Sequence, residues 1–273
     1  MSRHRQIVAA LAVILAGSLA AAGCGGVALP ATSQCIPAGY VYYLDGAGGG
    51  SAIQNWSGGV RKGLEAAGYS VFGEMFPWET GLGPLADQGA GVAYKRGKAK
   101  ELAARIQEHR KYCPGDAMHL IALSAGTAVA VYTLEALPDG LQVESVVLLG
   151  ASVSASHDLT AALRHVRNRL FIFTSSQDSV LRFLVPLTGT ADRDGGGAGP
   201  AGLVGFIIPP NASDETRRLY GEKVVTIAWK PEFERAGNYG GHLDNVNEEF
   251  IRDFVAPLVM SGRLAAAAKA GAP

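Results

Sequence analysis

The sequence lacks an excess of either charge. Its 273 residues include 24 Lys and Arg against 24 Asp and Glu, and only 18% of residues are charged. Proteins that neutralise nucleic-acid phosphates carry a surplus of basic residues, so the composition argues against a nucleic-acid partner. The sequence also lacks the low hydrophobicity of disordered proteins. Hydrophobic residues make up 48% of it, which excludes a largely disordered chain. The composition is that of a globular protein long enough to bury one large core.

No internal repeat is evident, and the apolar run near the N-terminus is short. Two basic residues, Arg3 and Arg5, precede this run, which covers residues 7–22. A comfortable membrane span takes about 20 apolar residues, so the run falls short of a transmembrane helix. A basic start followed by a short apolar stretch predicts an export signal.

The apolar run ends at Ala21-Ala22-Gly23-Cys24, which resembles the lipobox of bacterial lipoproteins. In that family small residues precede a cysteine that is lipidated on its thiol and becomes the new N-terminus. The resemblance implies a signal peptide over 1–23, lipidation of Cys24 and a tether over 24–39. The protein would then be an exported cell-envelope lipoprotein, membrane-anchored and periplasmic or on the surface. Ala21 stands where the motif usually has Leu, so a plain secretory signal is the alternative.

Cysteine is scarce, with 3 in the chain, and lipidation of Cys24 leaves two. Cys35 and Cys113 form an even pair in an oxidising compartment, where disulfides persist. Each lies about five residues before a predicted strand, so parallel neighbouring strands would place both thiols at the same end of the sheet. We predict a disulfide between them; two unpaired buried thiols are the alternative.

Short apolar runs alternate with longer amphipathic ones from residue 40 onward. This alternation predicts an α/β fold with a mostly parallel sheet of about six strands and helices on both faces. The predicted strands are Tyr40–Leu44, Tyr69–Met75, Met118–Leu123, Ser145–Leu149, Arg169–Thr174 and Lys223–Trp229, and the predicted helices are Ile53–Ala67, Ala93–Lys111, Gly126–Ala136, Asp158–Val166 and Val246–Met260.

One domain, residues 40–262, accounts for the chain after the tether. An Ala-rich tail over 263–273 is expected to fray. Two predicted loops are long, 77–91 and 180–222, and loops of such length are usually functional or disordered. The second holds the glycine-rich stretch 195–199 and the apolar patch Leu203–Ile208. It is either a candidate lid over an acyl pocket or an insertion that packs on the sheet.

Ser124 lies between a hydrophobic strand and a helix of small residues. Ala122 precedes it by two positions and Gly126 follows it by two. A nucleophile elbow requires small residues at both places, because its sharp turn brings the helix close to the strand. The motif therefore predicts a nucleophilic serine, whereas a serine that only caps the helix is the alternative.

Asp178 and His242 each follow a later strand. A serine nucleophile needs a base that takes its proton, and the base needs a carboxylate that orients it. The chain order Ser, Asp, His beyond the carboxyl ends of strands is that of the α/β-hydrolase triad. Asp158 is the rival acid and His157 the rival base, while Asp244 is too close to His242 in sequence to orient it comfortably.

Together these features resemble the α/β-hydrolase family over residues 40 to about 260, in the minimal form of small bacterial lipases. In that family a His-Gly-x-Gly loop supplies one N–H of the oxyanion hole. Asp45-Gly46-Ala47-Gly48 stands in its place here, so the resemblance implies that the Ala47 and Ala125 N–H groups are the donors. Because Asp45 departs from the pattern, either the Ala47 or the Gly48 N–H points inward.

The resemblance implies a serine hydrolase that cleaves a carboxylic ester, rather than a peptide, through an acyl-enzyme. A small-molecule or lipid ester would be the substrate, and neither a cofactor nor a metal is required. Two alternatives remain. One is a non-catalytic hydrolase-fold lipoprotein that binds a ligand or an envelope partner. The other is a dinucleotide-binding loop at Gly46-x-Gly48-x-Gly50 with Glu74, which leaves Ser124, Asp178 and His242 unexplained.

Overall fold

The computed structural model describes Cys35 and residues 39–50, 55–69, 72–193 and 197–260. The predicted signal peptide, Cys24, most of the tether and the C-terminal tail lie outside the described residues. Part of the glycine-rich stretch, residues 195–196, lies outside them as well. Within the described part of the chain, no helix combines the length and the apolar character that a membrane crossing requires.

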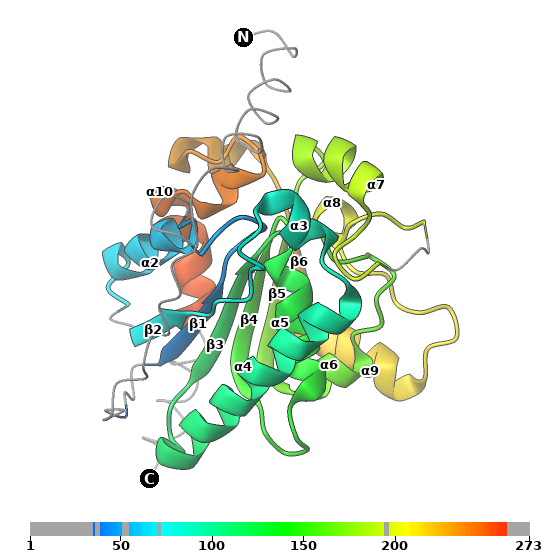
Figure 1. The fold of residues 1–273 in the computed structure, drawn as a ribbon. Helices are drawn as coiled ribbons and strands as arrows, with labels where there is room; N and C mark the ends of the chain where they lie inside the picture. The colour runs from blue at the N-terminus through cyan, green and yellow to red at the C-terminus, as the bar shows by residue number, and fades with distance from the viewer. Residues whose placement is uncertain (1–34, 36–38, 51–54, 70–71, 194–196, 261–273) are drawn as a thin grey trace, which may run out of the picture.

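A six-stranded sheet forms the centre of the protein (Figure 1). Its strand order is β2-β1-β3-β4-β5-β6, and every neighbouring pair is parallel, which confirms the predicted sheet. The strands are β1 (Tyr40–Leu44), β2 (Phe72–Met75), β3 (Met118–Leu123), β4 (Val143–Leu149), β5 (Val166–Thr174) and β6 (Val224–Ala228).

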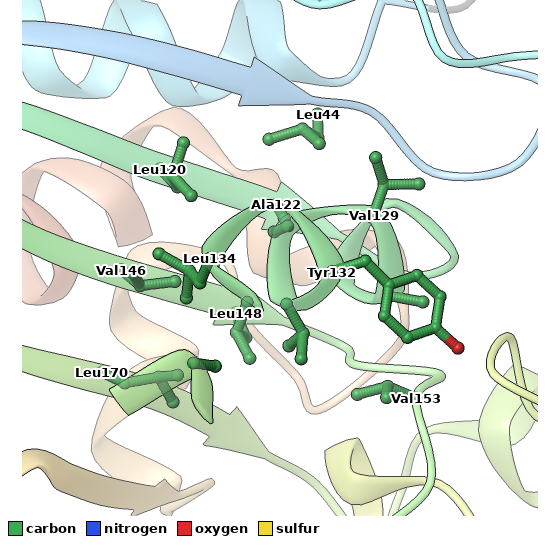
Figure 2. Close-up of a cluster of buried hydrophobic side chains, with 14 of the residues drawn as sticks. Leu44, Leu120, Ala122, Val129, Tyr132, Leu134, Val146, Leu148, Val153 and Leu170 are labelled. Atoms are coloured by element: carbon green, nitrogen blue, oxygen red, sulfur yellow. The ribbon is translucent and has the colours of Figure 1, made fainter. Parts of the chain in front are cut away.

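Successive residues of the central strands pack on opposite faces of the sheet, because side chains alternate along a strand. On one face, Leu120 and Ala122 of β3 join the cluster in Figure 2, which also contains Tyr132 of α5 (Gly126–Ala136). On the other face, Ile121 and Leu123 belong to a second cluster. Both faces of the sheet are therefore buried, as the near-continuous apolar strands require.

Helices cover both faces, as predicted. The first cluster receives side chains from α4 (Val92–Tyr112), α5, α6 (Thr160–Arg164) and α9 (Asp214–Lys223). The second receives them from α2 (Ser57–Ala66), α10 (Glu248–Phe250) and η5 (Ile251–Val255). The predicted helix start at Ile53 is wrong, because α2 begins at Ser57, where the side chains of Asp45 and Asn55 accept the first N–H groups.

The two stretches expected to be long loops contain helices, which corrects the prediction. Helix α3 (Pro84–Gly89) lies in the first, and η2 (Val180–Leu184), α7 (Val185–Thr188), α8 (Ala201–Val204) and α9 lie in the second. Helix α9 is the crossover before β6 and buries Leu219 and Tyr220. Its N-cap Ser213 accepts the Thr216 N–H, a start signal that the sequence displays. Two 3₁₀ turns, η3 (Pro231–Ala236) and η4 (Leu243–Val246), follow β6.

Cys35 and Cys113 form the predicted disulfide, with their Cα atoms 5.1 Å apart. Cys113 is the C-cap of α4, a few residues before β3, and Cys35 precedes β1. Strands β1 and β3 are parallel neighbours, and Tyr40 is in register with Met118. The bridge therefore lies at the amino end of the sheet and joins the start of two adjacent strands.

His157 is held between two carboxylates beside α5. Its Nε2 lies 2.6 Å from Glu135 Oε1, and its Nδ1 lies 3.2 Å from Asp192 Oδ2. Burial alone lowers the pKa of His157, but the hydrogen bonds with Asp192 and Glu135 outweigh it and raise the pKa to about 9. The positively charged form of His157 is therefore favoured in the folded protein, where it links Glu135 of α5 to Asp192.

This ion pair predicts a loss of stability at alkaline pH. A histidine whose pKa rises on folding contributes fully below its unfolded pKa of about 6.5, and the contribution disappears as the pH approaches 9. We expect His157→Gln to lower the free energy of unfolding by roughly 2 kcal/mol at pH 6 and by less at pH 9.5. Urea unfolding of both proteins at the two pH values measures the difference. A gap that is constant with pH would contradict the assignment.

Candidate active site

Ser124 joins β3 to α5 in a left-handed backbone conformation. Its φ is +51°, a region that costs a residue with a side chain on the order of 1–3 kcal/mol. Backbone contacts hold the turn: the Ser124 N–H donates to Leu149 O at 3.0 Å, and Ser124 O accepts the Thr127 N–H at 3.1 Å. The N-cap of α5 is Ala125, with no side-chain cap, so Ser124 does not act as a capping serine. A strained strand-to-helix turn of this kind is what a nucleophile elbow requires.

Gly126 permits this turn by lying against the neighbouring strand. A Cβ at residue 126 would be 2.4 Å from the carbonyl oxygen of Asp45 and 2.8 Å from that of Leu44, both of which are backbone atoms. Any side chain here would push α5 away from the end of β1. The small residue that the motif displays therefore has a direct steric cause.

His242 and Asp178 are brought together by the ends of β5 and β6. His242 Nδ1 lies 2.7 Å from Asp178 Oδ2; the Asp178 side chain is buried, and 9% of the His242 side chain is exposed. Asp178 also accepts the Leu181 N–H on Oδ1 at 3.0 Å, at the start of η2. Both carboxylate oxygens are therefore engaged, and the imidazole is oriented through Nδ1, which leaves Nε2 for chemistry.

The rival residues have other contacts. Asp158 accepts the N–H of Thr160 at 2.8 Å at the start of α6. His157 is held by its two carboxylates away from Asp178. Asp244 accepts the N–H groups of Tyr239 and Gly241, so it shapes the turn before His242 and does not orient the ring.

The imidazole of His242 lies over the peptide that follows β4. A Cβ built on Gly150 would be 3.1 Å from both Cε1 and Nδ1 of His242, and Gly150 has a φ of +52°. The preceding residue, Leu149, accepts the Ser124 N–H. One dipeptide thus contacts the serine turn and the histidine ring, and only glycine leaves room for the ring.

The sheet order, the elbow after β3, the carboxylate after β5 and the histidine after β6 now stand together. This chain has the α/β-hydrolase fold. The sheet has six strands, as the sequence predicted, and no strand precedes β1 among the described residues.

Three polar side chains that the sequence analysis did not single out hold the histidine loop of this hydrolase fold. Ser175 donates its hydroxyl to Gly240 O at 2.8 Å and thereby joins the loop of Asp178 to the loop of His242. Asn245 donates to His242 O at 3.1 Å, and Asn238 accepts the Gly240 N–H at 2.9 Å. Their positions, two in loops and Asn245 in the short turn η4, carry no periodic signal, so only the fold could reveal them.

The loop after β1 lies directly against Ser124. A Cβ on Gly46 would be 3.1 Å from Ser124 Cβ. The Gly48 N–H donates to Asp87 Oδ2 of α3 at 2.7 Å. Neither the Ala47 N–H nor the Ala125 N–H donates to another described residue. Of the two N–H groups left open by the sequence, that of Gly48 is bonded to Asp87, whereas that of Ala47 has no partner among the described residues.

Asp45 has a structural role in place of the histidine that the family usually has. Its Oδ1 accepts the Ser57 N–H at 2.7 Å, and its Oδ2 accepts the Gly50 N–H at 3.1 Å. Its carbonyl oxygen accepts the Trp78 indole N–H at 2.8 Å. The aspartate therefore ties the start of α2 to the glycine loop.

Three carboxylates gather behind the loop, namely Asp45, Glu79 and Asp87. Burial, with smaller contributions from the neighbouring Asp45 and Asp87, raises the pKa of Glu79 to about 8. Burial also raises the pKa of Asp45, although its backbone hydrogen bonds act against the rise. A raised pKa favours the protonated, uncharged carboxyl group, so burial limits the negative charge that gathers behind this loop.

In the part of the chain that the structure describes, His109, Cys113 and Asp116 form a cluster whose side chains are close enough to hold a metal ion. Cys113 is bonded to Cys35, so its sulfur is not a free thiolate. His109 and Asp116 instead bond to each other at 3.0 Å near the disulfide.

Comparison with known proteins gives matches among solved structures alone. No protein-family profile and no curated protein matches the chain. The ydeN gene product from B. subtilis aligns at 14% identity, with a TM-score of 0.45, over 82% of this chain and 99% of that one. An esterase domain of a Rhodothermus marinus protein aligns at 14% identity, with a TM-score of 0.40, over 87% and 89%. An acetylxylan esterase aligns at 13% identity, with a TM-score of 0.39, over 87% and 100%.

Proposed function

We propose that this protein is a serine hydrolase that cleaves a carboxylic ester. The observation that carries the proposal is the His242–Asp178 contact of 2.7 Å, with the His242 ring against Gly150 and the strained turn of Ser124 bonded to the preceding residue, Leu149. Strained backbone persists only where the surrounding structure enforces it, and it gathers at functional sites. A histidine held by a carboxylate next to such a serine is the arrangement that activates a hydroxyl.

In the proposed reaction the Ser124 oxygen attacks the carbonyl carbon of the ester, and His242 takes the hydroxyl proton. Asp178 stabilises the imidazolium, and the Ala47 and Ala125 N–H groups bind the negative oxygen. The intermediate collapses, the alcohol leaves with the proton from His242, and an acyl-enzyme remains on Ser124. Water, deprotonated by His242, then attacks the acyl carbon and releases the acid.

We also propose that the protein acts as an exported lipoprotein anchored through Cys24. Its lipobox-like sequence Ala21-Ala22-Gly23-Cys24 supports this. The Cys35–Cys113 disulfide is in keeping with an oxidising compartment. A small-molecule or lipid ester is the proposed substrate class, because nothing in the mechanism requires an amide.

Covalent labelling tests the proposed nucleophile. We expect one fluorophosphonate adduct on the full-length protein by intact mass, because a fluorophosphonate traps only an activated serine. Ser124→Ala should remove the adduct. Ser152→Ala is the matched control, since Ser152 is a buried neighbour whose N–H contacts Ser124 O. A folded protein without an adduct would favour the non-catalytic alternative, in which the fold only binds a ligand or an envelope partner.

A further inference from the structure

Helix α3 is amphipathic in the reverse of the usual sense. Its polar residues Asp87 and Gln88 are buried, with 1% and 7% of their surface exposed. Its leucine Leu85 is 58% exposed, and Leu82, just before the helix, is 82% exposed. Leucine is usually buried and aspartate is usually exposed. On this helix both preferences are reversed.

The segment formed by η2 and α7 adds two more exposed apolar side chains. Leu181 and Val185, four positions apart, are buried. Phe183 and Leu187, also four positions apart, are 56% and 84% exposed. Residues four apart lie on the same side of a helix, so the segment packs one apolar side inward and presents a second one to solvent.

Polar contacts fasten α3 to the end of α7. Gln88 Nε2 donates to Gly189 O at 3.0 Å, and Arg193 donates to Gly89 O at 2.8 Å. The buried Lys95 donates to both segments, to Gln88 O at 3.0 Å and to Ala191 O at 2.9 Å. These contacts pack the two segments together, and we call their exposed side chains, Leu82, Leu85, Phe183 and Leu187, the apolar face. Figure 1 shows α3 and α7 beyond the tips of the strand arrows, the end of the sheet at which Ser124 lies.

The exposed charge on these segments has one sign. In the described residues 80–91 and 176–193, the carboxylates of Asp87, Asp178 and Asp192 are all buried. Each of them accepts hydrogen bonds within the protein. The exposed charges of these ranges are Arg182 and Arg193. These two described ranges expose leucine, phenylalanine and arginine but no carboxylate. Such a surface suits a membrane whose headgroups are anionic and whose interior is apolar.

We propose that the apolar face docks the protein on an anionic phospholipid surface. Leu82, Leu85, Phe183 and Leu187 enter the boundary between headgroups and acyl chains, while Arg182 and Arg193 meet the lipid phosphates. The biological use of this docking rests on the proposed function, because it would bring a lipid ester to Ser124. Helix α3 also fixes the loop of Ala47 through Asp87 and Gly48, so docking surface and oxyanion loop share one element.

A fluorescent label tests the docking. The full-length protein with Leu187→Cys is labelled with the environment-sensitive probe NBD. Asp139→Cys is the matched control, since Asp139 is exposed in the turn before β4, at the opposite end of the sheet. The parent protein, treated in parallel, supplies the background from Cys24. With phosphatidylglycerol vesicles, we expect the emission of the label at 187 to shift to shorter wavelength and to gain intensity, and the label at 139 to change little.

The matching charge is tested in the same assay. Arg182→Gln is expected to weaken the response to phosphatidylglycerol about fivefold in lipid concentration, because one basic residue near such a surface contributes about that factor. Phosphatidylcholine vesicles should give a weaker response than phosphatidylglycerol. An equal response to both lipids would overturn the anionic preference.

Three results would overturn the docking itself: no response at 187, equal responses at 187 and 139, or a shift at 187 without vesicles that grows with protein concentration. The last would assign the apolar face to a second copy of the chain. The readout requires no catalysis. Docking can therefore succeed while fluorophosphonate labelling fails, or the reverse, and the two proposals are tested separately.

Discussion

His242→Ala is expected to lower kcat for a soluble ester by about 10⁴-fold or more, and Ser124→Ala by a similar factor. The double variant should be no slower than either single one. The reason is that the serine and its base act as a unit: without the imidazole at 2.7 Å from Asp178, the hydroxyl keeps its proton and the nucleophile is not formed. Initial rates with a short p-nitrophenyl ester measure all three proteins.

A second histidine variant supplies the control. His157→Gln removes an imidazole that is also held by carboxylates, but His157 contacts Glu135 and Asp192 rather than the serine turn. We expect its kcat at pH 7 to stay close to that of the parent. If the losses of Ser124→Ala and His242→Ala multiply in the double variant, the two residues act independently, and the proposed acyl-enzyme mechanism is wrong.

Removal of the Cys35–Cys113 bridge is expected to cost about 4 kcal/mol of unfolding free energy. The bridged residues are 78 apart in sequence, and closing so long a loop strongly restricts the unfolded chain in the entropy model. For a domain of this size the cost corresponds to a drop in Tm of roughly 8–16 °C. Urea and thermal unfolding of the Cys35→Ser, Cys113→Ser double variant measure the loss.

The reduced parent protein is the matched control for the double variant and should show the same loss. Kinetics with a soluble ester at low temperature should remain near the parent value, because the bridge is at the amino end of the sheet and the serine turn is at the carboxyl end. Two free thiols in the untreated, denatured parent would contradict the disulfide.

The sheet was predictable because its strands are short, apolar and separated by helical patterns. Met118–Leu123 and Gly126–Ala136 were located to the residue, since buried strands and small-residue helices have sharp compositional borders. The strand at Tyr40–Leu44 was also predicted without error. The ends of helices and strands that depend on side-chain caps or on strand pairing were not predicted. Strand β4 begins at Val143 rather than at Ser145, and its pairing with β5 shifts register between these two residues.

The site was predictable to the level of chain order. The order Ser124, Asp178, His242 selected three residues, and the structure brings the last two into contact. The choice between Ala47 and Gly48 could not be made from the sequence, because it depends on Asp87, which lies in a stretch expected to be a loop. A buried aspartate on a six-residue helix has no periodic pattern that would mark it.

The position of the disulfide has a consequence for how far the catalytic end can reach. In a chain anchored by a lipid at Cys24, the eleven residues 24–34 are the part of the tether before the disulfide. Eleven residues span at most roughly 40 Å when fully extended and about 20 Å as a flexible coil. The disulfide fixes the end of this part of the tether at Cys35, at the amino end of the sheet. Ser124 follows β3 at the carboxyl end, about 20 Å from there along the strands. This part of the tether is therefore at least as long as that distance, so an anchored protein can turn the carboxyl end of its sheet, with the apolar face, onto the leaflet that carries the anchor.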